Sequence, residues 1–122
     1  MEKINSHRDL KIWRKGIDLV KEIYSICKLL PKDEIYALQS QLKRVAVSVP
    51  SNMAESYGRN STKSFIQFLR IARGSLLEID TQMTIAFELQ FIDQKKFDNT
   101  IELIIEENKM INSFISSLEK HL

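Results

Sequence analysis

The chain has 122 residues, of which 43% are apolar and 28% charged, with only three Gly and two Pro. This composition predicts one helix-rich globular domain and argues against disordered and loop-rich classes. The first residues lack the apolar stretch of a signal peptide, and no apolar run approaches the roughly 18 residues that span a bilayer. We therefore expect a cytoplasmic protein with no membrane contact, and the single cysteine, Cys27, fits a reducing compartment.

The net charge of +2 hides an asymmetry along the chain. Residues 1–75 hold 14 Lys/Arg against 7 Asp/Glu, whereas residues 76–122 hold 4 against 9. Such a distribution predicts a dipolar surface with one side that attracts phosphates. The alternative is that antiparallel helices interleave these charges and cancel the field.

The first predicted helix runs from about residue 9 to residue 30 and ends before Pro31. It carries two apolar stripes, about 100° apart. We expect the core to receive the stripe Leu10, Trp13, Ile17, Val20, Tyr24 and Cys27. The second stripe is Ile12, Leu19, Ile23, Ile26 and Leu30. It either widens the apolar arc that touches two neighbouring helices or serves self-association.

The second predicted helix spans residues 34–57, and its apolar phase crosses Pro50 without a break. The phase is carried by Ile35, Leu38, Leu42, Val45, Val49 and Met53. Because proline removes the hydrogen bond to the Ala46 carbonyl, we expect a kink in one continuous helix rather than a break and restart. Gly58 is expected to end this helix as a left-handed cap.

The third helix is predicted from residue 61 to residue 90, with Asn60 or Ser61 as its N-cap, and the fourth from 94 to 121, capped by Asp93. The inward seam of the third is Phe65, Phe68, Ala72, Ser75, Ile79, Met83 and Ala86. That of the fourth is Phe97, Ile101, Ile104, Asn108, Ile111, Ile115, Leu118 and Leu122, beside a second stripe of Leu103, Met110 and Phe114. Four helices with short connections predict an all-α, up-down-up-down antiparallel four-helix bundle in one domain.

Apolar residues on the outer side of the third helix predict self-association. Ile66 and Leu77 should point to the side that carries Lys63 and Arg70, away from the seam. Contact with further copies of the chain would cover them. We therefore expect a homo-oligomer.

Several short motifs resemble one known family. They are Pro31–Glu34, Ala37–Gln41, Lys43-Arg44, Val47–Pro50, Asn52–Glu55 and Phe68–Ser75 with Glu78. The chain resembles the four-helix-bundle family encoded in intervening sequences of bacterial 23S rRNA genes, with the accessory variability protein of diversity-generating retroelements as a relative. The resemblance implies a homopentamer, association with nucleic acid and no enzymatic activity. Ser56 departs from the pattern, because the family usually has Gly directly after Ala-Glu.

A row of polar residues follows one edge of the second helix and is either a site or a structural network. It consists of Gln41, Arg44, Ser48, Asn52 and Glu55. In the structural interpretation Arg44 pairs with Glu55 or Glu78, and hydroxyl or amide groups satisfy the carbonyls freed by Pro50. Gly74 and Ser75 would then permit close helix contact beside the kink.

The sequence predicts no catalytic residue, metal site or cofactor. Two-metal helix bundles need inward-facing Glu-x-x-His pairs, and the only histidines, His7 and His121, lie near the ends of the chain. Cys27 has no histidine nearby in the sequence and is expected to be a buried apolar residue. No glycine-rich phosphate loop is present, because Gly16, Gly58 and Gly74 stand singly.

The basic residues are the best candidates for function. We predict that phosphates of RNA or DNA are bound by Lys11, Arg14, Lys15, Lys43, Arg59, Lys63, Arg70 and Arg73. Such binding would weaken steeply with salt and read little sequence, since only Tyr57 is expected to be exposed for base stacking. Two alternatives stay open. The cations form a solvated face with partners such as Asp18 and Glu22, or the protein is an interaction scaffold that docks a protein on its apolar grooves or its acidic C-terminal half.

Overall fold

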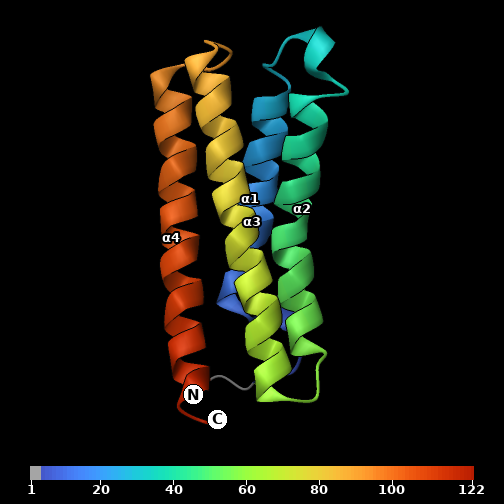
Figure 1. Cartoon of the computed structure of the whole chain (residues 1–122), viewed down its shortest axis with the longest axis vertical. Coiled ribbons are helices and arrows are strands. Elements are labelled where there is room, and N and C mark those ends of the chain that lie inside the picture. Colours follow the sequence, from blue (N-terminus) through green and yellow to red (C-terminus); the bar gives the residue numbers. More distant parts are fainter. Residues whose placement is uncertain (1–3) are drawn as a thin grey trace.

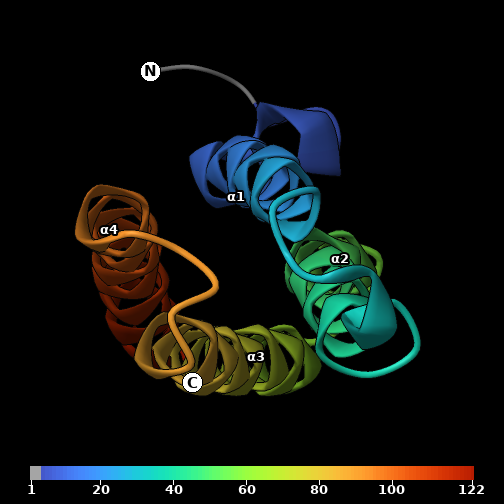
Figure 2. The same cartoon turned by 90° about the horizontal axis from the view of Figure 1, so that it is seen from above.

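The computed structural model describes residues 4–122 and contains four long antiparallel helices (Figure 1). These are α1 (Lys11–Cys27), α2 (Leu38–Tyr57), α3 (Thr62–Glu88) and α4 (Gln94–Glu119), with two short 3-10 turns, η1 (His7–Asp9) and η2 (Lys32–Glu34). Seen from above, the helices follow one another around the bundle in chain order (Figure 2). This arrangement confirms the all-α, up-down-up-down four-helix bundle.

Local capping groups fix the starts of the two longest helices. The Ser61 hydroxyl accepts a hydrogen bond from the Ser64 N–H at 3.1 Å, and the Asp93 carboxylate accepts one from the Lys96 N–H at 2.8 Å. Each satisfies a backbone donor that has no partner within its helix. Both caps are where the sequence predicts them.

The structure corrects the ends of the first and second helices. A 3-10 turn forms before each of them, so α1 begins at Lys11, and α2 begins at Leu38 rather than at residue 34. The Glu34 side chain accepts a hydrogen bond from the Leu38 N–H at 3.2 Å and thereby caps α2, which leaves Ile35 exposed outside the expected seam. Gly58 has a right-handed φ of −76°, so the expected left-handed cap is wrong. The left-handed residue is Gln90, with φ 65°, between α3 and α4.

The core-facing side of α1 is centred on the second stripe rather than on the first. Leu10 and Cys27 of the first stripe are buried as expected, so α1 presents the wide apolar arc that one alternative predicted. The expected second stripe is buried, namely Ile12, Leu19, Ile23, Ile26 and Leu30. By contrast, Tyr24 is exposed and Trp13 is half-buried. The reason is Gly16, which is also buried and completes the series 12, 16, 19, 23, 26, 30 at steps of four and three. This stripe therefore forms part of the core and is not surplus surface for self-association.

The seams of α2 and α3 are largely as expected. Buried positions include Leu42, Val45, Val49 and Met53 on α2, and Ala72, Ser75, Ile79, Met83 and Ala86 on α3. Ile66 is a correction: it is 2% exposed, because it shares the face of Leu69 and Leu76. Leu77 points outward as expected and is 67% exposed.

The seam of α4 differs from expectation in its middle and at its end, where α4 stops at Glu119 and Leu122 is 73% exposed. Ile104, Ile111 and Ile115 are buried as expected, but Glu107 and Thr100 complete the buried face. Asn108, expected in the core, is only half-buried, because residue 107 lies in phase with the three isoleucines. A charged side-chain type thus occupies the centre of the bundle.

Candidate nucleic-acid interface

Antiparallel packing gathers basic residues from three parts of the chain at one end of the bundle. The start of α1, the α2–α3 connection and the end of α4 meet there (Figure 1). When each helix is divided near its middle, this half comprises residues 4–19, 48–75 and 107–122, with ten Lys/Arg against five Asp/Glu. The opposite half, residues 20–47 and 76–106, has seven against ten. We call the first half the basic end; the charges therefore do not cancel along the long axis.

Seven of the eight predicted phosphate-binding cations lie at the basic end, and Lys43 lies in the other half. They surround this end rather than form one face. Arg70 and Arg73 extend from α3 to α4, where Arg70 pairs with Glu119 at 3.4 Å and Arg73 donates to the Asn112 side-chain oxygen Oδ1 at 2.8 Å.

Other cations of the basic end have local partners on different sides of the bundle. Arg14 pairs with Asp18 at 3.4 Å, as one alternative expected. Lys15 pairs with Glu106 of α4 at 2.7 Å, and this hydrogen-bonded ion pair raises the pKa of the lysine.

Arg59, Lys43, Lys11 and Lys63 complete the predicted set. Arg59 pairs with Glu55 and places its guanidinium 4.5 Å from the centre of the Phe68 ring. Lys43 lies 5.1 Å from the centre of the Tyr24 ring, at the opposite end. Within residues 4–122, neither Lys11 nor Lys63 forms an ion pair. These two lysines are the members of the set most free to meet a phosphate.

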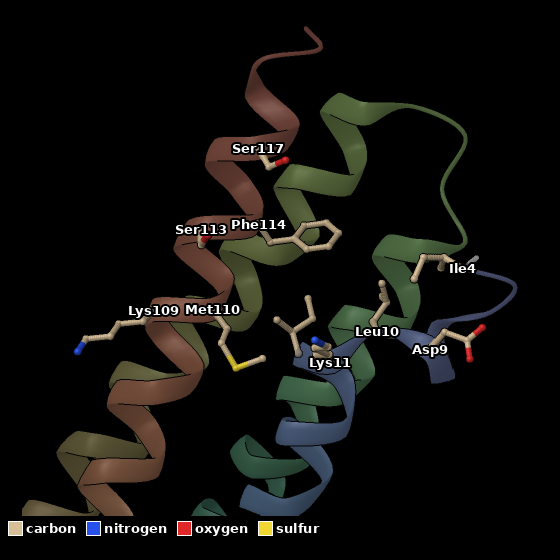
Figure 3. Close-up of a pocket in the computed structure, with 10 residues that line it drawn as sticks. Ile4, Asp9, Leu10, Lys11, Lys109, Met110, Ser113, Phe114 and Ser117 are labelled. Carbon is tan, nitrogen blue, oxygen red and sulfur yellow. The ribbon is translucent and has the colours of Figure 1, made fainter. Parts of the chain in front are cut away.

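A pocket of about 550 Å³ opens at the basic end between α1 and α4 (Figure 3). Side chains from both helices and from the preceding segment line it: Ile4, Asp9, Leu10, Lys11, Ile12, Lys109, Met110, Ser113, Phe114 and Ser117. Its walls are mostly apolar, and the Phe114 ring projects from α4 toward α1. Two lysines are among its lining residues: Lys11, which the sequence singled out, and Lys109, which it did not and whose side chain extends from α4 away from the Phe114 ring.

The polar row on α2 does not contain the predicted ion pair. Arg44 is exposed and donates to the Gln41 side-chain oxygen at 2.8 Å instead of pairing with Glu55 or Glu78. Positions 44 and 55 are eleven residues apart on one helix, which is a rise of about 16 Å and too far for a direct contact. Glu55 pairs with Arg59 instead. Glu78 is exposed on α3 and takes part in no ion pair among the described residues.

The rest of the polar row is a compact network beside Pro50. The Ser48 hydroxyl lies 2.6 Å from the Val45 carbonyl oxygen and 2.7 Å from the Ser75 hydroxyl, which links α2 to α3. Asn52 donates to the Ser48 carbonyl at 2.7 Å. These bonds end on carbonyls near the one that Pro50 frees, that of Ala46, rather than on that carbonyl itself. The helix continues through the proline.

Gly74 does not have the packing role expected of it. A Cβ atom at this position would meet nothing within 4 Å, so the glycine permits no close helix contact within the subunit. The adjacent Ser75 makes the contact, through its hydroxyl bond to Ser48. Gly74 is instead an exposed position on the outer side of α3.

Glu107 is a buried charged residue type that the sequence analysis did not single out. Its side chain is 0% exposed, and neither carboxyl oxygen has a hydrogen-bond partner among the described residues. Burial raises its pKa to about 8, with Lys15 opposing the shift and Asp18 adding to it. Residues 104, 107 and 111 follow the seam spacing of three and four, so periodicity predicts that position 107 is buried. The residue type predicts the opposite, because glutamate is usually on the solvent side.

The remaining titratable candidates are structural. Cys27 is buried, its Sγ lies 3.8 Å from the Gln39 carbonyl oxygen, and burial raises the pKa of its thiol. The His7 ring packs edge-on against Trp13. Over residues 4–122, no three His, Cys, Asp or Glu side chains are grouped so that they could hold a metal ion. None of the helices described is both long and apolar enough to cross a membrane.

Comparison with known proteins identifies a family and a solved structure of the same fold. The crystal structure of a protein of unknown function from Bacteroides thetaiotaomicron VPI-5482, of the S23 ribosomal protein family, superposes with a TM-score of 0.79 at 21% identity. The match covers 85% of this chain and 97% of that one, and at this identity it shows the common fold. No curated protein matches. A family model described as 23S rRNA-intervening sequence protein matches residues 8–113. The chain therefore belongs to the 23S rRNA-intervening sequence protein family.

Proposed function

We propose that this protein is a non-enzymatic, oligomeric bundle in the cytoplasm that binds RNA or DNA through backbone phosphates at its basic end. The observation that carries the proposal is the excess of ten Lys/Arg over five Asp/Glu in that half of the molecule. Phosphate contacts dominate the affinity of proteins for nucleic acids, and they need positive charge rather than a preformed pocket. The family's link to ribosomal RNA agrees with such a ligand.

The ion pairs at the basic end do not prevent phosphate binding. Arg59 and Arg70 pair with Glu55 and Glu119, and all four side chains are about half exposed. Exposed pairs of this kind contribute about 0–1 kcal/mol, so an arginine can leave its carboxylate for a phosphate at small cost. Lys11 and Lys63 need no such exchange.

Exposed apolar residues on the outer side of α3 support self-association. This α3 face consists of Ile71, Leu77, Ile85 and Leu89, all among the exposed large apolar residues. Gly74 lies on the same side with open space around it, which lets another helix come close. A homopentamer, the assembly that the resemblance implies, would repeat the basic end five times and increase the avidity for a long polyanion.

The test is a titration of fluorescent 20-nucleotide single-stranded and duplex RNA with the full chain, followed by anisotropy at several salt concentrations. We expect binding that weakens steeply with salt, with a slope set by the number of phosphates neutralised. The double variant Arg59→Gln, Lys63→Gln should bind more weakly and with a shallower slope. The single variants Lys63→Gln and Lys43→Gln are the matched pair, because each removes one charge. The proposal leaves Lys43 out of the contact surface because it lies in the other half, so Lys43→Gln should bind as wild type.

Two results would contradict phosphate binding. One is no binding of either strand at 50 mM salt; the other is binding whose affinity does not change with salt. An equal loss from Lys43→Gln and from the basic-end variant would argue against the basic end as the contact surface.

A protein-interaction scaffold is the alternative, and one observation favours it. At the end opposite the basic end, Tyr24, Ile35, Tyr36 and Val47 line a hollow of about 500 Å³, and Tyr36 is 96% exposed. Exposed aromatic residues of this kind are common in protein interfaces. The scaffold is favoured over the first proposal if nucleic acid does not bind while Tyr36→Ser abolishes the capture of a defined protein partner.

A further inference from the structure

We infer that the pocket between α1 and α4 receives an unstacked nucleobase, so that the protein prefers single-stranded over duplex nucleic acid. This inference rests on the proposed function, because it concerns the same basic end. The ligand class follows from two properties of the pocket: apolar walls that include an aromatic ring, and two lysines among its lining residues, Lys11 and Lys109. The Lys109 side chain extends along the outside of α4, away from the Phe114 ring, so its ammonium lies outside the apolar space (Figure 3).

The apolar walls suit the flat face of a base. Leu10, Ile12, Met110 and Phe114 form them, in a space of about 550 Å³, which lies in the range of small-molecule sites. Phe114 is half-buried and stacks on Phe65, with ring centres 5.5 Å apart and planes at 19°. Phe65 therefore supports the Phe114 ring from one side, and the ring still lines the pocket. Bases that have left a helix stack on such rings, and every base can do so.

The edge of the pocket suits phosphate. Lys11 comes from the start of α1 and Lys109 from α4, and neither forms an ion pair within residues 4–122. One carboxylate, that of Asp9, also lines the pocket. Its Oδ2 atom accepts backbone hydrogen bonds from Asn5 at 2.8 Å and Ser6 at 3.2 Å, which disperse its charge. A ligand in which a flat aromatic base is joined to a phosphate matches this combination of groups.

A duplex cannot use the pocket in this way. Its bases are stacked and paired, so one can enter only if it is extruded at the cost of unstacking. Single strands, loops and bulges expose bases at much lower cost. The pocket therefore adds affinity for single strands to the phosphate binding that both forms share.

The chain offers a matched pair of variants to test this. Phe114→Leu removes the pocket ring and its stacking on Phe65. Phe97→Leu removes the equivalent ring at the opposite end, where Phe97 stacks on Phe87 with centres 4.7 Å apart and planes at 17°. Circular dichroism and thermal unfolding of both variants establish that each remains folded. Any difference in binding then reports the pocket and not a general loss of aromatic packing.

The probe is a 12-nucleotide single strand of RNA with 2-aminopurine at its centre, alone or annealed to its complement. With wild-type protein the fluorescence of the single strand should rise on binding, because the base leaves the neighbouring bases that quench it and enters the pocket. Phe114→Leu should abolish this rise and weaken single-strand binding roughly 5-fold or more, without weakening duplex binding. Phe97→Leu should behave as wild type. The double variant Lys11→Gln, Lys109→Gln should weaken the binding of the single strand more than that of the duplex.

Different outcomes separate the two proposals. If neither strand binds at 50 mM salt, phosphate binding itself fails. If both bind with the same affinity, and Phe114→Leu has no more effect than Phe97→Leu, phosphate binding stands and the base pocket is wrong. If an acidic amphipathic peptide binds in a manner that requires Lys11 and Lys109 while single strands do not, the pocket is a protein-docking site instead.

Discussion

Gly16 leaves the space that the Glu107 carboxyl occupies: a Cβ atom at position 16 would lie 3.2 Å from the glutamate Oε2 and 3.4 Å from the Pro50 Cβ. Gly16 on α1, Pro50 on α2 and Glu107 on α4 lie at the same height in the bundle. Each is a residue type that is unfavourable in a helix interior or in a core. A glycine and a proline weaken their helices, and a buried carboxyl loses its hydration. Such local conflicts tend to be concentrated at one place in a protein, and here they meet near the middle of the bundle.

Glu107→Gln should stabilise the protein and reduce the dependence of its stability on pH. The pKa of Glu107 is about 8 in the folded protein, against an ordinary value near 4.5. Between these two pH values the folded chain holds a proton that the unfolded chain releases, so the free energy of unfolding falls as pH rises. Glutamine does not titrate, and at pH 7 we expect a gain of about 3 kcal/mol. Urea unfolding at pH 4, 7 and 9 measures it.

The control for this prediction is the adjacent residue. Glu106 is half exposed and pairs with Lys15 at 2.7 Å. Glu106→Gln should change the stability by less than about 1 kcal/mol and keep the decline toward alkaline pH. Equal slopes of stability against pH in wild type and Glu107→Gln would show that the carboxyl is not neutral in the folded protein.

Gly16→Ala should destabilise the protein although alanine is the better helix former. The new methyl group would crowd the Glu107 carboxyl and Pro50, at a cost of about 1–2 kcal/mol. Gly74→Ala is the matched control, because a Cβ there meets nothing within 4 Å. In the isolated subunit, where no second helix packs on this position, it should stabilise the protein by about 0.5–1 kcal/mol through helix propensity. Urea unfolding of the two variants should show changes of opposite sign in the free energy of unfolding. A gain in both would mean that the Glu107 side chain moves away from the new methyl group at no cost.

Gln90→Gly should stabilise the connection between α3 and α4. Gln90 has φ 65°, a left-handed conformation that costs a residue with a Cβ atom about 1–2 kcal/mol. Glycine avoids that cost but loses more backbone freedom on folding, so the net gain should be about 0.5–1 kcal/mol. Thermal unfolding at fixed protein concentration should show a higher midpoint for Gln90→Gly and no gain for Gln90→Ala. A lower midpoint for the glycine variant would contradict the prediction.

Leu77→Glu should dissociate the proposed oligomer without unfolding the subunit. Leu77 is 67% exposed on the α3 face, so a charge there costs little in an isolated chain but much in an apolar contact between chains. Multi-angle light scattering at tens of micromolar should give several chains per particle for wild type and fewer for the variant. Leu77→Met, which keeps the apolar surface, should behave as wild type. A wild-type monomer at every concentration would remove self-association from the proposal.

The helices and most of their inward faces could be predicted because the signals are local. Ser61 and Asp93 each cap the next few backbone N–H groups, and the stripes on α2 and α3 repeat within every two turns. The centre of the core-facing arc of α1 was placed wrongly because both stripes have helical spacing, although Leu10 and Cys27 of the expected stripe are buried. Gly16 decides between them, and glycine carries no apolar signal. The role of Gly16 can be recognised only in the structure, where the Glu107 carboxyl packs against it.

The candidate site was harder to predict, since it depends on which helices are neighbours. The two halves of the sequence differ in charge, but only the up-down path shows that seven of the eight predicted cations lie at one end. The pocket beside Lys11 needs Lys109 and Phe114, which are about one hundred residues away. The prediction of an Arg44–Glu55 ion pair was wrong because it considered only that the two residues share one face of the helix. It ignored their separation along the helix axis. The relation to the accessory variability protein of retroelements stays a prediction.

The lengthwise separation of charge has a consequence for encounters in solution. A polyanion exerts a torque on a free subunit and turns the α2–α3 connection toward itself before any contact forms. Salt limits the reach of this torque to about 10 Å at 0.1 M, so the subunit aligns only during the final approach. Under the proposed function the tip of the rod would make the first contact, end-on to the strand, and the α3 face would stay clear for the proposed contact with other copies.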